Sequence, residues 1–63
     1  MAAELTVEER RVLEMSARPT PESEIAEELG LEVWEARRLV QQVWRKVGVE
    51  NIAQARLYLQ TIR

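Results

Sequence analysis

Apolar residues recur at every third or fourth position along most of this 63-residue chain, and its overall pattern does not read as strand. This spacing is typical of amphipathic α-helices, so the sequence predicts an all-α fold. Proline and glycine residues divide the pattern into four segments. The four predicted helices run from about Val7 to Ala17, from Pro21 to Leu29, from Val33 to Val47 and from Asn51 to Ile62.

Polar residues at the start of these segments have the character of helix N-caps. Thr6 and Glu9 are spaced as a capping box, in which each side chain accepts a hydrogen bond from the backbone N–H of the other residue. Thr20 is the expected N-cap of the second helix, with Pro21 at the first helical position, where no backbone N–H is needed. Asn51 is the expected N-cap of the fourth helix.

Two glycines separate the later helices. Gly30 is expected to take the left-handed backbone conformation that commonly ends a helix, and Gly48 is expected to stop the third helix. The second and third helices are then joined by a three-residue turn that contains a glycine, which is the layout of a helix-turn-helix. Because the chain is short enough for only one domain, residues 1–63 are predicted to form a single compact four-helix unit.

On each predicted helix the apolar residues fall on one face, and these faces form the candidate core. They comprise Val12, Leu13 and Ser16 or Ala17 on the first helix, Ile25, Ala26 and Leu29 on the second, Ala36, Val40, Val43 and Val47 on the third, and Ile52, Ala55, Leu59 and Ile62 on the fourth. Trp44 lies beside the apolar face of the third helix, which predicts that its ring packs against the core.

The third predicted helix has a second, polar face. At about 100° per residue, four polar residues lie within about 60° of Trp34; they are Arg37, Arg38, Gln41 and Arg45. Arginine can bond bidentately to guanine and glutamine to adenine, and an α-helix fits the major groove of DNA. This face is therefore a candidate DNA-reading surface. An arginine stripe is also typical of a solvated helix face, and the helix and turn that precede it favour the DNA interpretation.

The charge of the chain is unevenly distributed. The formal net charge is −2, whereas nucleic-acid-binding domains are usually basic on the contact surface. Residues 1–30 hold eight glutamates and three arginines, a net charge of −5, whereas residues 31–63 hold six basic and three acidic residues, a net charge of +3. The third helix therefore belongs to the basic half of the chain.

The residue types that are missing exclude several kinds of chemistry. Cysteine, histidine and aspartate are absent from the sequence, so disulfides and ordinary zinc sites cannot form, and we expect no metal and no cofactor. The usual nucleophile–base pairs of enzymes cannot be assembled either, so we do not expect an enzyme. No apolar run approaches the roughly 20 residues of a membrane span, and no signal peptide is recognisable. We expect a cytoplasmic protein without a membrane partner.

Three segments, in order and without insertions between them, resemble the LuxR-type (GerE-like) DNA-binding domain. Residues 5–18, LTVEERRVLEMSAR, are similar to the opening segment of that family. EIAEELG at residues 24–30 is similar to its second helix, and RKVGV at residues 45–49, with Asn51, Ala53 and Ala55, is similar to the segment after its third helix. The resemblance covers nearly the whole chain. It implies a helix-turn-helix domain of the LuxR C-terminal type that regulates transcription by binding double-stranded DNA.

The same resemblance implies roles for individual residues. In the family the third helix enters the major groove, so Arg37, Arg38 and Gln41 occupy positions that contact bases or phosphates. Contacts with the sugar–phosphate backbone of DNA are implied for Trp34, Arg45 and Lys46. The fourth helix of relatives often forms a dimer interface, which implies a homodimer here with Ile52, Arg56 and Leu59 at its contact.

The chain departs from the family pattern at several polar positions. Glu22-Ser23 replaces an Asn-Lys pair, and the residues that replace usually polar ones are Glu32, Trp34, Glu35, Leu39 and Ile52. These changes remove phosphate contacts and add apolar surface. Two interpretations therefore stay open. The chain is either a DNA-binding regulator acting as a homodimer, or the same fold binding a protein of the transcription machinery or another regulator. The second interpretation uses four residues that are apolar where the family is polar, namely Val33, Trp34, Leu39 and Ile52. Tryptophan in particular is enriched in protein interfaces.

Overall fold

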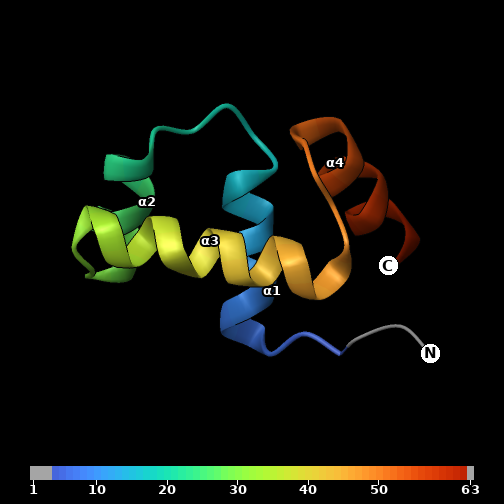
Figure 1. The fold of residues 1–63 in the computed structure, drawn as a ribbon, viewed down its shortest axis with the longest axis horizontal. Coiled ribbons are helices and arrows are strands. Elements are labelled where there is room, and N and C mark those ends of the chain that lie inside the picture. The colour runs from blue at the N-terminus through green and yellow to red at the C-terminus, as the bar shows by residue number, and fades with distance from the viewer. Residues whose placement is uncertain (1–3, 63) are drawn as a thin grey trace.

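The computed structural model of the chain describes residues 4–62 (Figure 1). Within this range it contains four α-helices and no strand, which confirms the all-α prediction. The helices are α1 at Val7–Ser16, α2 at Glu22–Leu29, α3 at Val33–Val47 and α4 at Ile52–Thr61. Each predicted boundary lies within one residue of the observed one. None of the helices in residues 4–62 combines the length and the apolar character needed to cross a membrane.

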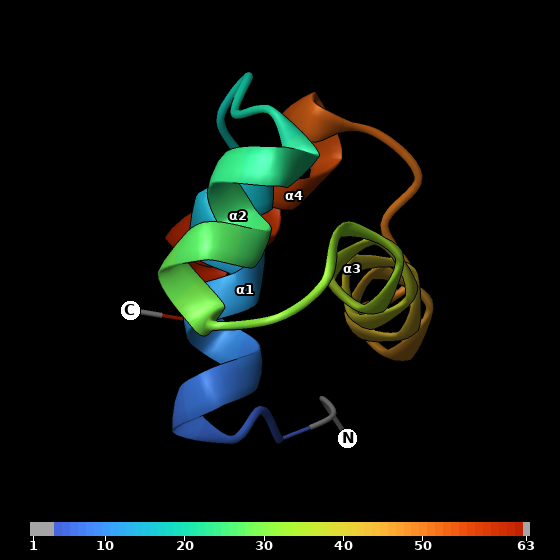
Figure 2. The same cartoon turned by 90° about the vertical axis from the view of Figure 1, so that its left-hand side faces the viewer.

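The longest helix, α3, lies along one side of the molecule, and the other three helices lie on the opposite side of it (Figure 2). It crosses α1 and packs against both α1 and α2, while α4 packs against α1 (Figure 1). One long face of α3 is therefore turned toward its neighbours, and the face away from them is open.

Two of the predicted N-caps are confirmed. The Thr6 hydroxyl accepts from the Glu9 N–H at 3.0 Å, and the Thr6 N–H donates to Glu9 Oε1 at 2.9 Å, which completes the capping box of α1. At the start of α4, Asn51 Oδ1 accepts from the Gln54 N–H at 2.9 Å. These bonds satisfy backbone donors that have no partner within the helix.

The predicted start of α2 is wrong by one residue. Pro21, with φ −59° and ψ 144°, is itself the N-cap, and no side chain caps the helix. The proline ring fixes φ at a helical value but leaves ψ free, and here ψ is extended. The Pro21 carbonyl accepts from the N–H groups of Glu24 and Ile25. Thr20 therefore lies outside the helix and does not cap it.

Gly30 and Gly48 end α2 and α3 with φ values of 68° and 77°, as expected for left-handed C-terminal residues. This conformation costs residues with a side chain roughly 1–2 kcal/mol. Residues 30–32 form the short connection between α2 and α3. The direction of α3 relative to α2 is thus set by a turn that glycine makes possible.

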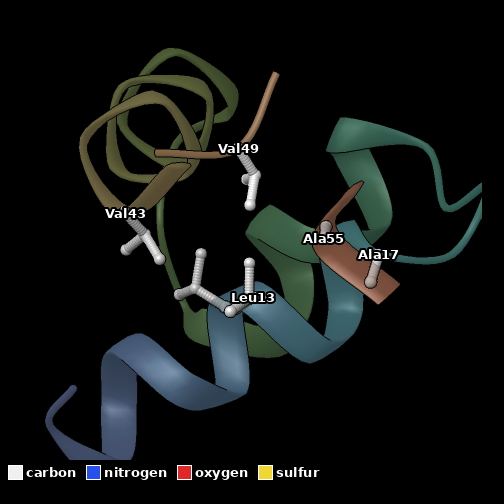
Figure 3. Packing of buried hydrophobic residues seen from close by; sticks show 6 residues of the cluster. Leu13, Ala17, Val43, Val49 and Ala55 are labelled. Carbon is white, nitrogen blue, oxygen red and sulfur yellow. The ribbon is translucent and has the colours of Figure 1, made fainter. Parts of the chain in front are cut away.

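The core consists of two clusters. The first lies where α1, α3 and α4 meet and contains Val12, Leu13, Ala17, Val43, Val49 and Ala55. In Figure 3, Leu13 faces Val43 and Val49, and Ala17 lies beside Ala55. The second cluster lies between α2 and α3 and contains Ile25, Ala26 and Ala36. Leu29 and Val40 pack against both clusters and so connect them.

Most of the predicted core residues are buried or half-buried. Leu59 and Ile62 are half-buried, whereas Ile52 is 37% exposed and lies at the edge of the core. Val49, which follows α3 and belongs to no helix, is buried although helical spacing could not select it.

Trp44 packs against the first cluster, as predicted, and its contact explains a polar residue in the core. Its Nε1–H donates to Ser16 Oγ at 2.8 Å, and the Ser16 hydroxyl donates to the Leu13 carbonyl at 3.2 Å. Ser16 is only 7% exposed. Both polar groups are thereby satisfied, which removes the cost of burying them unpaired.

Candidate nucleic-acid interface

The two faces predicted for α3 are present in the structure. Ala36 and Val43 are buried, and Val40 and Val47 are half-buried, on the face toward the other helices. The residues predicted for the outer face are all exposed, namely Trp34, Arg37, Arg38, Gln41, Arg45 and Lys46. Because the buried face locks the rotation of α3 about its axis, the same outer side chains always point away from the core.

Five side chains in the C-terminal two-thirds of α3 line an open hollow on this face, namely Arg38, Gln41, Gln42, Arg45 and Lys46. Three of them are cationic and two are amides, so every lining side chain can donate hydrogen bonds. Gln42 was not predicted as a site residue. Its position four residues after Arg38 would have placed it beside that side chain on the helix surface.

The cations at the two ends of this face are paired with carboxylates. Arg37 Nε donates to Glu22 Oε2 at 2.6 Å, which joins α3 to the first residue of α2. Lys46 Nζ donates to Glu9 Oε1 at 2.8 Å, which joins the end of α3 to the first turn of α1. Neither ion pair was predicted, because the partners stand 15 and 37 residues apart in the sequence.

Glu9 has a structural role in addition to its contact with Lys46. The hydrogen bond from Lys46 lowers the pKa of the Glu9 carboxyl, and the bond from the Thr6 backbone N–H lowers it further. The carboxylate is thus held in its charged form, in which it both caps α1 and binds Lys46.

Arg38 and Arg45, in the middle of the face, have no such partner: within residues 4–62 no carboxylate lies within ion-pair distance of either. Seven residues at a rise of about 1.5 Å separate them by roughly 10.5 Å along the helix axis. The two guanidinium groups, with Gln41 between them, are therefore free to bind phosphates or base edges.

The N-terminal end of α3 is acidic and apolar. Glu35 Oε1 accepts from the Glu32 backbone N–H at 3.0 Å, so Glu35, one of the departures from the LuxR pattern, helps to cap the helix. A carboxylate at this end also interacts favourably with the helix dipole. Val33 is 41% exposed and Trp34 63% exposed, so two apolar side chains are open to solvent at this end of the helix. Leu39, by contrast, packs against the first core cluster.

The residues predicted for a dimer contact on α4 do not lie in one environment. Ile52 and Arg56 are exposed, whereas Leu59 is half-buried and packs against the first core cluster. Leu57, which was not predicted, is 61% exposed. Arg56 lines a groove between α1 and α4 together with Arg10 and Arg18, and no residue of α3 contributes to that groove.

Within the described part of the chain, no group of three or more acidic, histidine or cysteine side chains is arranged to hold a metal ion. Comparisons with protein-family models, with curated proteins and with solved structures each gave no match for this chain. The function is therefore inferred from the residues and geometry of α3 and its surroundings.

Proposed function

We propose that this chain binds double-stranded DNA by placing α3 in the major groove, and that it regulates transcription as a helix-turn-helix domain of the LuxR type. The observation that carries the proposal is the middle of the outer face of α3. Arg38 and Arg45 are exposed there without a carboxylate partner among residues 4–62, and Gln41 stands between them.

The chemistry of these side chains suits a DNA groove. A guanidinium group can donate two hydrogen bonds to guanine or bind a phosphate, and the Gln41 amide matches the donor and acceptor pattern of adenine. Gln42, which lines the same hollow, adds a donor for the sugar–phosphate backbone. The packing of Ala36 and Val43 holds all of these groups on one rigid helix.

Two copies of the chain would bind a symmetric DNA site. One such domain makes few contacts, and a second copy one helical turn away, about 34 Å along the duplex, would double them. The molecule measures 32 × 20 × 18 Å, which allows two copies to occupy successive major grooves on one side of the DNA. Exposed residues of α4, among them Ile52 and Leu57, are available for the contact between copies.

The experiment that tests the proposal is a filter-binding titration with a random-sequence duplex at about 50 and 200 mM salt, since non-specific DNA affinity falls steeply over this range. We expect binding at the lower concentration, and we expect Arg38→Ala combined with Arg45→Ala to abolish it. The matched control is Arg10→Ala combined with Arg18→Ala, which removes the same charge from the groove between α1 and α4. Absence of binding by the unaltered chain at 50 mM salt, or equal losses in the two double variants, would contradict the proposal.

A second candidate function, binding to a protein of the transcription machinery, is favoured by one observation. Val33 and Trp34, consecutive residues at the start of α3, are both exposed, and tryptophan is enriched at the centre of protein interfaces. If this surface binds a protein, Trp34→Ala will weaken binding to purified RNA polymerase or to a sigma factor. Unchanged binding by that variant would leave DNA as the supported partner.

A further inference from the structure

The ion pair between Glu22 and Arg37 holds an arginine of the candidate DNA-binding face against the protein itself. The two side chains keep 45% and 61% of their surface exposed, so both remain in contact with solvent. An exposed pair of this kind contributes little to folding stability. The ion pair therefore matters mainly because it neutralises a positive charge that α3 would otherwise present to other molecules.

Glu22 occupies a place that is favourable for a DNA phosphate. It is the first residue of α2, and no side chain caps that helix end. Backbone N–H groups and the helix dipole attract anions to such an end, and Arg37 adds a guanidinium group at 2.6 Å. The Glu22 carboxylate already occupies the position that a DNA phosphate would take, and its negative charge would repel an approaching phosphate.

The second ion pair of α3 differs in a way that singles out Glu22. Glu9 binds Lys46 and also accepts from the Thr6 backbone N–H, so it contributes to the start of α1. Within residues 4–62 the Glu22 side chain has only Arg37 as a hydrogen-bond partner. Removing the Glu22 charge would thus change the electrostatics of α3 without removing a helix cap.

We infer that Glu22 acts as an internal substitute for a DNA phosphate, which keeps Arg37 from contacting DNA and weakens binding of the whole face. The inference rests on the proposed function and deepens it. It assigns DNA contact to Arg38 and Arg45, and it makes Glu22 the residue that sets the strength and the salt dependence of binding. Opening of the ion pair adds one phosphate contact.

The test is a double-mutant cycle of Glu22→Gln and Arg37→Gln, with binding to the random-sequence duplex measured from about 50 to 200 mM salt. One additional phosphate contact steepens the slope of log affinity against log salt by about 0.9, so the gain in affinity at 50 mM should be roughly 3.5-fold larger than the gain at 200 mM. We expect these gains for Glu22→Gln. When Arg37→Gln is added to Glu22→Gln, the gain in affinity should disappear. Arg37→Gln alone should change the slope of log affinity against log salt only a little.

Glu24→Gln is the matched control, because Glu24 is another exposed first-turn glutamate of α2 and makes no ion pair in the described residues. It changes the net charge equally and should leave the slope unchanged. If the unaltered chain binds DNA and Glu22→Gln behaves like Glu24→Gln, the inference is overturned while the proposed function stands. If the unaltered chain does not bind at 50 mM salt, the proposed function fails, and the inference that rests on it fails as well. The ion pair itself is checked without DNA by nitrogen NMR, in which Glu22→Gln should change the Arg37 Nε–H signal.

Discussion

Trp34 and Trp44 are the same residue type on one helix, and their surroundings give them opposite roles. The ring of Trp44 packs against the first core cluster, and its N–H is bound by Ser16 Oγ. Trp34 is 63% exposed. The role of each tryptophan therefore follows from the face of α3 on which it stands, and helical spacing predicted that difference correctly.

Alanine substitutions at these two positions should have very different effects on stability. Trp44→Ala removes core packing and leaves Ser16 without its donor, so we expect a loss of roughly 3 kcal/mol. Total stabilities are only about 0.05–0.15 kcal/mol per residue, so this loss is large for so short a chain. Trp34→Ala should change stability by less than about 0.5 kcal/mol. Thermal unfolding followed by circular dichroism measures both, and a large loss for Trp34→Ala would mean that the ring supports the core.

At the scale of the helices, the features that were predicted correctly depend on residues close together in the sequence. The capping box of Thr6 and Glu9 and the N-cap Asn51 involve partners three residues apart, so the sequence displays them directly. The boundary at Pro21 was missed because ψ, which the proline ring does not restrict, decides whether the helix includes that residue. Val49 was missed because it is buried by the path of the chain after α3 and not by helical periodicity.

The candidate site was predicted less completely than the helices, for a physical reason. The helical repeat predicts which residues lie on the outer face of α3, and the structure confirms that Arg38, Gln41 and Arg45 are exposed there. The partners of Arg37 and Lys46 come from α2 and α1, so they depend on how the helices pack together. Sequence alone thus identified the cations but not which of them are free to bind another molecule.

The contact between α1 and α3 through Glu9 and Lys46 should make stability depend on pH. The Lys46 hydrogen bond is the largest cause of the lowered pKa of Glu9. A carboxyl whose pKa is lower in the folded state stabilises the fold fully above its unfolded-state pKa, and this contribution is lost as the pH falls through the folded-state pKa. We therefore expect Lys46→Met to lower the stability near neutral pH. This loss should disappear in acid, below the usual pKa range of glutamate.

A carbon NMR titration of the Glu9 carboxyl measures this directly. Lys46→Met should raise the pKa of Glu9 toward its ordinary value, while the bond from Thr6 keeps part of the shift. Arg45→Met is the matched control, because it removes the neighbouring charge and does not contact Glu9 in the structure. A titration curve that is the same in Lys46→Met and in the unaltered chain would show that the ion pair is absent in solution.

At the scale of the whole molecule, the two halves of the chain carry opposite net charges. Helix α3 lies on one side of the fold (Figure 2), and its four cationic residues are exposed. Such a distribution orients a domain toward an anionic surface even though its total charge is negative. If the proposed function holds, α3 is the only helix in the groove, so we expect affinity to depend on bringing a second copy to the same DNA.

Sedimentation at micromolar concentration tests whether two copies associate. We expect a dimer, and we expect Leu57→Glu to weaken it, because Leu57 is the most exposed large apolar residue of α4. Gln60→Glu, which adds the same charge at another exposed position of α4, serves as the control. The thermal midpoint of both variants should stay close to that of the unaltered chain. A strict monomer at this concentration would contradict association through α4.

The contrasting positions of the two tryptophans give the molecule a pair of intrinsic fluorescent probes. An indole in water emits at longer wavelength than one held in an apolar environment, so Trp34 and Trp44 contribute different parts of the emission spectrum. Quenching of Trp34 would report occupation of the outer face of α3, whereas a red shift of Trp44 would report loss of the core. Variants that keep a single tryptophan, with phenylalanine at the other position, would thus allow ligand binding and unfolding to be followed separately without any attached dye.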